Sequence, residues 1–247
     1  MLEHSLHNDQ LPEPTLAELA ARLAPVGLNA WGIADGAPWQ DILPGCRSVL
    51  VLGSGGPTLW QALNDAVRAD QGLLDGHLHP LDDFVARAIA EADPSPPPYR
   101  RWLRCAGDEA QQIDFRSLAQ AAGLGHPSRL GLLLHPEYGP WLGLRAACFS
   151  QEDVRPTGPL RGLGPCLNCP APCMCACPGN AVPAASWGRF SILKCSAFRK
   201  ISTPCRIGCD ARRACPEGAQ HAYDALELHY HQDKRSGRVA WRRSLRT

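Results

Sequence analysis

The feature that most constrains the fold of this 247-residue chain is the crowding of its cysteines toward one end. Of its twelve cysteines, nine fall between Cys166 and Cys215, in a stretch rich in Gly and Pro with little hydrophobic periodicity. Such a stretch is typical of a fold organised around inorganic groups rather than around packed side chains. The cysteines are therefore expected to bind a metal or an iron-sulfur cluster.

The rest of the composition indicates a cytoplasmic protein. The chain begins without the cationic start and apolar run of a signal peptide, and it contains no run of about 18 apolar residues that could cross a membrane. In a reducing compartment its cysteines are not expected to form disulfides. Lys plus Arg number 25 against 24 for Asp plus Glu, so the overall charge favours neither nucleic acid nor a membrane surface as a partner.

The first cysteine motif resembles that of a bacterial ferredoxin. Cys166, Cys169, Cys173 and Cys177 are separated by two, three and three residues, and Pro178 follows the last. The ferredoxin run is C-x2-C-x2-C-x3-C-P, so one residue is inserted before Cys173. In that run three thiolates hold one [4Fe-4S] cluster, whereas the cysteine before proline binds a second cluster. The motif therefore predicts a second set of ligands.

A second set follows, with looser spacings of nine, three and five residues and Pro216 after its last cysteine. By the crossed arrangement of ferredoxins, each cluster takes the C-P cysteine of the other motif. The predicted ligands are Cys166, Cys169, Cys173 and Cys215 for the first cluster, and Cys177, Cys195, Cys205 and Cys209 for the second. Cys175 is left over; it could replace Cys173, although the three-residue interval before the C-P cysteine favours Cys173.

Zinc and free thiols are the alternatives. Zinc held by four cysteines usually uses paired C-x2-C knuckles on either side of a longer loop, and it gives no reason for two C-P endings. The cysteines that lie before residue 160, Cys46, Cys105 and Cys148, are predicted to be ordinary buried thiols.

The preceding region reads as alternating helices and strands. Thr15 and Glu18 form a capping box for a helix, and after a turn that contains Gly and Trp we expect a buried strand at 49–52. Helices are predicted over 58–69, 81–92 and 115–122, and strands over 130–134 and 142–149 on either side of a turn. The predicted class is α+β, with an N-terminal α/β domain followed by a ferredoxin-like double-cluster domain.

These observations divide the chain into four parts. Residues 1–14 are predicted to be an N-terminal extension, 15–155 an α/β domain that binds a corrinoid or a substrate, and 156–224 the domain of the two [4Fe-4S] clusters. Residues 225–247 are basic, and we expect them to form a solvated, partly disordered tail.

The chain resembles the epoxyqueuosine reductase family and, more distantly, the reductive dehalogenases. Four stretches carry the resemblance: residues 16–35, 43–53, 113–150 and the cysteine region. It implies a corrinoid between the α/β domain and the clusters, with electrons passing to cobalt. It also implies that Asp114 matches the proton-donating aspartate of the family; the alternative is that Asp114 caps the helix that follows it.

The predicted function is that of an iron-sulfur oxidoreductase, which carries electrons through two [4Fe-4S] clusters to a corrinoid or a substrate between the domains. The alternative is a non-catalytic electron carrier or a corrinoid-binding protein. The expected cofactors are the two clusters and cobalamin. An electron donor of flavodoxin or ferredoxin reductase type is the expected partner, together with a small-molecule substrate or corrinoid. Because the chain lacks the helical repeats of many epoxyqueuosine reductases, a tRNA partner is not expected.

Overall fold

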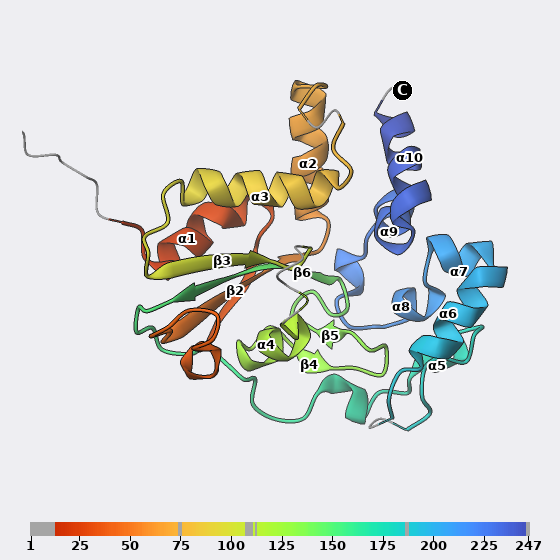
Figure 1. Ribbon diagram of the computed structural model, residues 1–247. Coiled ribbons are helices and arrows are strands. Elements are labelled where there is room, and N and C mark those ends of the chain that lie inside the picture. The colour runs from red at the N-terminus through yellow and green to blue at the C-terminus, as the bar shows by residue number, and fades with distance from the viewer. Residues whose placement is uncertain (1–12, 74–75, 107–110, 112, 186–187, 246–247) are drawn as a thin grey trace, which may run out of the picture.

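A four-stranded sheet forms one half of the molecule (Figure 1). The computed structural model describes residues 13–73, 76–106, 111, 113–185 and 188–245. The strands β1 (Ala30–Asp35), β2 (Ser48–Gly55), β6 (Leu142–Ser150) and β3 (Arg100–Arg104) lie in that order, and each neighbouring pair is antiparallel. The α+β class is confirmed. The α/β description, which implies parallel strands, does not hold for this sheet.

Helices cover both faces of the sheet, which explains why every residue of β2 is buried. On one face Leu50 and Leu52 pack with α1 (Leu16–Leu23), α2 (Thr58–Ala69) and α3 (Pro80–Ala92). On the other face Val49 and Val51 pack with α4 (Phe115–Ala121). Side chains alternate between the two faces of a strand, so one unbroken apolar run supplies both cores.

The helices of this region lie close to their predicted bounds, and the Thr15–Glu18 capping box is present. The predicted strand at 130–134 is wrong in extent, because only β5 (Leu133–Leu134) is extended, and it pairs with β4 (His126–Pro127) instead of with β6. Strands β1 and β3 were not predicted. In β1 an exposed Trp31 and a glycine interrupt the apolar pattern, and β3 consists largely of arginine.

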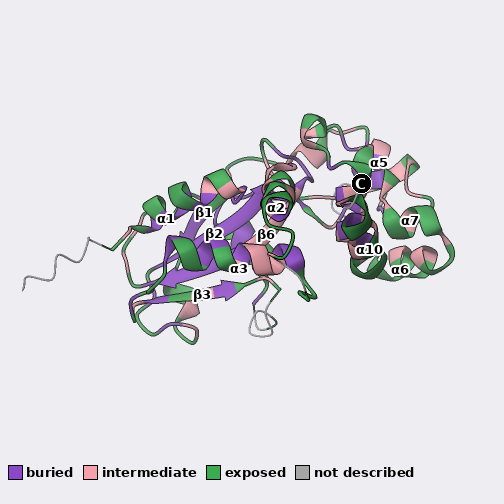
Figure 2. Cartoon of the chain, turned by 90° about the horizontal axis from the view of Figure 1, so that it is seen from above, coloured by how far each residue is buried: buried purple, intermediate pink, exposed green. Residues whose placement is uncertain are grey.

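The cysteine-rich half is built from short elements joined by loops. Its α-helices are α5 (Pro172–Cys175), α6 (Ile192–Ile201), α7 (Thr203–Ile207) and α8 (Asp210–Arg213). Single 3-10 turns occur here at Pro165–Leu167 and Ala219–His221, and in the sheet half at Ala24–Val26 and Ala37–Trp39. Figure 2 shows the strands of the sheet largely buried and α6 and α7 largely exposed, so the cysteine region has little apolar core of its own.

The prediction of a disordered tail is wrong. Residues 225–245 form α9 (Ala225–Gln232) and α10 (Lys234–Ser244), which pack against the sheet half. Trp241 is 2% exposed, donates its indole N–H to Asn64 Oδ1 and contacts Trp60. The Tyr230 hydroxyl accepts a hydrogen bond from the backbone N–H of Leu81. The helical period places Trp241 on one face of α10 and most of its arginines on the other.

No described helix is both long and apolar enough to cross a membrane. Of the predicted N-terminal extension, residues 1–12 lie outside the described part of the chain.

Candidate metal centres

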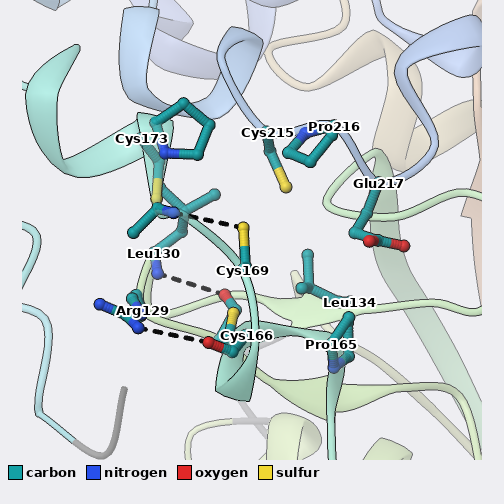
Figure 3. A pocket seen from close by; sticks show the side chains of 13 residues that line it. Arg129, Leu130, Leu134, Pro165, Cys166, Cys169, Cys173, Cys215, Pro216 and Glu217 are labelled. Atoms are coloured by element: carbon teal, nitrogen blue, oxygen red, sulfur yellow. Dashed lines mark hydrogen bonds between the residues drawn. The ribbon is translucent and has the colours of Figure 1, made fainter. Parts of the chain in front are cut away.

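Four cysteines from two distant segments line one pocket. These are Cys166, Cys169 and Cys173 from the first motif and Cys215 from the second. Figure 3 shows the sulfur atoms of Cys169 and Cys215 directed toward each other across this pocket. Proline, leucine and alanine side chains supply much of the remaining wall. The structure thus brings together the four residues that the sequence assigns to the first cluster.

The local chain direction explains how this first pocket forms. Ala171 has a left-handed backbone conformation with φ of 57°, which is uncommon for a residue with a side chain. This turn lets the Ala171 backbone N–H donate to Cys169 Sγ at 3.4 Å, and α5 begins at the next residue. Cys173 lies buried on α5, whereas Cys175 on the same short helix is exposed. Of the two alternatives, Cys173 is therefore the one that faces the pocket.

The four cysteines that are predicted to bind the second cluster line a second pocket. Cys177 comes from the first motif, and Cys195, Cys205 and Cys209 come from the second. Phe190, Phe198 and Leu130 form part of the wall, and Leu130 also lines the first pocket. The Ala181 backbone N–H donates to Cys177 Sγ at 3.4 Å, as Ala171 does to Cys169.

The two pockets differ in size. The side chains leave a space of about 10 Å³ in the first and about 230 Å³ in the second. A group larger than a water molecule would require the first four cysteines to move apart. Among the described residues, no group of three or more His, Cys, Asp or Glu side chains is arranged to hold a metal ion as it stands. The assignment of the two centres therefore rests on the residues that line them.

Burial raises the pKa of several of these thiols. For Cys215 burial is the largest cause, and with the nearby thiols of Cys166, Cys169 and Cys173 it raises the pKa to about 11, although a backbone hydrogen bond opposes the shift. The pKa of Cys173 is also raised, first by burial and then by its neighbours in the same pocket. Such thiols are protonated at neutral pH, so binding of a metal must displace their protons.

Burial also raises the pKa of thiols in the second pocket. Burial is the first cause that raises the pKa of Cys195 and of Cys209, and Cys177 adds to both shifts. The interacting thiols in each case belong to the same set of four.

A buried arginine stands at the wall of each pocket, and sequence reasoning did not identify either one. Arg129 donates to the carbonyl oxygen of Ala184 and, at 3.3 Å, to that of Cys166 (Figure 3). Its exposure is 7%, and its Nε has no hydrogen-bond partner among the described residues. In the sequence, the one sign that Arg129 could be buried is the apolar run of residues 130–134 that follows it.

Arg212 is the counterpart in the second pocket. It donates to the Pro140 carbonyl oxygen from Nη2 at 2.7 Å and from Nε at 3.1 Å. Its guanidinium lies 4.6 Å from the ring centre of Trp141 and 4.8 Å from that of Tyr223. These contacts hold a cation beside the cysteines and also join the cysteine region to the sheet half.

Asp114 lies in neither cysteine-lined pocket. Its carboxylate caps α4 by accepting hydrogen bonds from the backbone N–H groups of Arg116 at 3.0 Å and Ser117 at 3.2 Å, and from Ser117 Oγ at 2.6 Å. The hydrogen bonds from Ser117 are the main reason why the pKa of Asp114 is lowered. The capping alternative is therefore confirmed, and the proton-donating role stays a prediction.

The cysteines before residue 160 lie outside both pockets. Cys46 and Cys148 are buried in the two cores of the sheet half, as predicted. Cys105 is partly buried, and desolvation is the main cause that raises its pKa to about 12.

The chain matches no protein-family model, and no curated protein is similar enough in sequence to count as a match.

Solved structures with the same fold do exist. An epoxyqueuosine reductase solved with an epoxyqueuosine-modified tRNA stem loop is 16% identical over 86% of this chain and 68% of its own, with a TM-score of 0.52. The epoxyqueuosine reductase of Streptococcus thermophilus is 13% identical over 82% of this chain and 65% of its own, with a TM-score of 0.50. The B12-trafficking protein CblC of C. elegans is 12% identical over 88% of this chain and 91% of its own, with a TM-score of 0.50. At these identities the likeness establishes a shared fold.

Proposed function

We propose that this chain is an iron-sulfur protein that holds two [4Fe-4S] clusters and passes single electrons through them. One observation carries the proposal: each pocket is lined by three cysteines of one motif and by the C-P cysteine of the other. Double-cluster ferredoxins use this crossed arrangement because the cysteine before proline faces away from its own motif.

The surroundings of both pockets suit clusters held by thiolates. Cysteine sulfurs in both pockets accept backbone N–H···S hydrogen bonds, of the kind that tunes cluster potential. A [4Fe-4S] cluster with four thiolates carries net negative charge, and Arg129 and Arg212 would each offset part of it at their own pocket. In the first pocket the four cysteines would have to separate as iron enters.

The arrangement suits transfer between the two centres. Leu130 lines both pockets, and α5, which carries Cys173, packs against α8, which directly follows Cys209. In each step one electron would reduce one cluster and oxidise its donor, with no bond made or broken. A protein that only stored iron or used zinc for stability would not need two such centres side by side.

The electron acceptor is proposed to be a corrinoid or a substrate bound by the sheet half. The observation that favours a corrinoid is the shared fold with the C. elegans protein named for B12 trafficking, which covers nearly the whole of both chains. A non-catalytic carrier or corrinoid-binding protein is the second candidate, since the capping role of Asp114 needs no catalytic explanation. Absorption spectra with added cobalamin test this part, and an unchanged corrinoid spectrum would argue against it.

The cluster proposal is tested by iron, sulfide and zinc analysis of anaerobically purified protein. Two clusters correspond to about eight iron and eight sulfide per chain. Stoichiometric zinc without sulfide would overturn the proposal.

Paired substitutions test the crossed arrangement. Replacing both Cys173 and Cys215 by alanine should remove one cluster only, leaving about four iron, because both residues line the first pocket. Replacing both Cys173 and Cys177 should remove both clusters, because these residues line different pockets. If each motif instead bound its own cluster, the two results would be exchanged. Cys175→Ala is the matched control and should keep all of the iron.

A further inference from the structure

The segment that encloses the second pocket is strongly basic. Residues 188–209 contain five cationic side chains and no Asp or Glu, whereas the whole chain has 25 cationic residues against 24 carboxylates. The cations of this segment are Arg189, Lys194, Arg199, Lys200 and Arg206. The excess of positive charge is therefore local to the region of the second pocket.

A wide, open hollow lies beside the second pocket. Its walls come from α6, α7 and the start of α10, and Arg199 and Gln232 line both the hollow and the pocket. Among the described residues that line the hollow, Asp233 is the one carboxylate. This carboxylate caps α10 through the backbone N–H groups of Arg235 and Ser236 and lies 3.6 Å from Arg206, so it is already engaged. The cations of the hollow are Arg199, Lys200, Arg206, Lys234 and Arg235.

Large apolar side chains are exposed on the same helix that carries Cys195. On α6, Ile192 is 72% exposed, Leu193 is 84% exposed and Ile201 is 83% exposed. Adjacent exposed aliphatic side chains, such as Ile192 and Leu193 at the start of α6, commonly mark a surface that a partner covers. We call Ile192 and Leu193, together with the cations of the hollow, the basic face.

We propose that the basic face is the docking site of an acidic electron-donor protein. The inference rests on the proposed function, because it takes the second pocket to hold a cluster. The basic face borders this pocket, so the donor would deliver its electron to the second cluster. One electron would leave the reduced donor and reduce the cluster, and the donor would be oxidised by one electron. Redox partners form small, short-lived interfaces that charge complementarity steers.

A protein partner fits this surface better than RNA does. Single-stranded RNA is bound through aromatic side chains on which its bases stack, in addition to cations. The large exposed side chains of the basic face are aliphatic. Such side chains suit the dry centre of a protein interface with a charged rim.

The test compares two variants with equal change in charge. Lys200→Glu with Arg235→Glu reverses two exposed cations of the basic face. Arg104→Glu with Arg155→Glu reverses two exposed arginines that lie in neither cysteine pocket nor the hollow. An acidic flavodoxin serves as the donor, and the radical cation of methyl viologen serves as a small reductant that needs no docking surface. Two quantities are measured on protein with full iron content: the affinity for oxidised flavodoxin, and the second-order rate constant of cluster reduction.

The expected result is a loss of about tenfold or more in both quantities for K200E/R235E at low salt, since complementary charge raises association rates by that order. The control variant should behave like the wild type, and the rate with methyl viologen should be equal in all three proteins. The wild-type rate with flavodoxin should fall as salt rises.

Two outcomes would overturn the inference. Equal behaviour of both variants toward flavodoxin would show that the basic face is not the docking site. Weaker binding of a labelled RNA stem loop by K200E/R235E, with unchanged reduction by flavodoxin, would assign the face to RNA instead. Failure of the proposed function is a separate result, because protein without iron and sulfide would show it before any donor is added.

Discussion

Glu227 is a buried carboxyl group that should make the protein less stable as pH rises. It lies on α9 with 2% exposure, and its Oε2 has no hydrogen-bond partner among the described residues. Burial is the main cause that raises its pKa to about 8, and nearby Asp224 adds to the shift, although Arg145 and Arg212 oppose it. His231 Nε2 lies 3.8 Å from Oε1, but burial lowers the pKa of this histidine well below its ordinary value. At neutral pH the contact therefore joins two largely uncharged groups.

The size of the effect follows from proton linkage. In the unfolded chain Glu227 loses its proton near its ordinary pKa of 4.5, whereas the folded protein holds the proton up to about pH 8. Between these values the unfolded state binds fewer protons than the folded state, so the free energy of unfolding falls as pH rises. Each pH unit is worth about 1.4 kcal/mol, which gives a total loss of at most about 5 kcal/mol from this group.

Glu227→Gln tests this reasoning, because glutamine has nearly the same shape and does not ionise. The assay is urea unfolding followed by tryptophan fluorescence between about pH 5 and pH 9, on preparations with equal iron content. As pH rises across this range, the free energy of unfolding of the variant should increase relative to that of the wild type by about 3 to 5 kcal/mol. Glu91→Gln, at an exposed position on α3, is the control and should show no such gain.

A constant difference between wild type and Glu227→Gln across the pH range would refute the argument. It would mean that Glu227 keeps its ordinary pKa in the folded protein, because Arg145 or Arg212 lies close enough to stabilise its charge. Infrared detection of a protonated carboxyl at neutral pH, absent from the variant, would give independent support.

Three further predictions address the site and the fold. Cys173→Ala should lower the iron content from about eight to about four per chain, whereas Cys175→Ala should leave it unchanged, and equal losses would contradict the assignment of Cys173. Trp241→Ala should lower the free energy of unfolding by about 3 to 5 kcal/mol in urea because it empties a buried site; a loss below about 1 kcal/mol would indicate that α10 is not docked in solution. Asp114→Ala should cost about 1 kcal/mol through loss of the helix cap, while Asp114→Asn should cost less, and thermal unfolding that is the same for all three proteins would argue against the cap.

Part of the fold could be predicted because the information is local. The capping box at Thr15 and the bounds of α2 depend on residues within a few positions of one another. The grouping of the eight cysteines was also predictable in outline. Short spacing lets three thiols of one loop reach one centre, and a C-P ending directs the fourth toward another.

Other features depend on contacts between distant segments. Strand β3 is largely arginine, yet it is extended because each of its residues pairs with a residue of β6 more than 40 positions further along the sequence. The C-terminal helices looked like a solvated basic tail, but Trp241 and Tyr230 find a matching apolar surface on α2 and α3. A pattern of charge along the chain does not reveal whether such a surface exists.

The candidate site also combines features that the sequence predicts with features that depend on tertiary contacts. The ferredoxin-like spacing and the two C-P endings predicted which cysteines would line the same pocket. Only the tertiary structure decided that Cys173 and not Cys175 faces inward, and that Arg129 and Arg212 stand beside the two sets of cysteines. These arginines come from segments with no cysteine spacing to mark them. Their positions are set by contacts with backbone carbonyl groups and aromatic rings from distant parts of the chain. Such contacts cannot be read from the residues next to each arginine in the sequence.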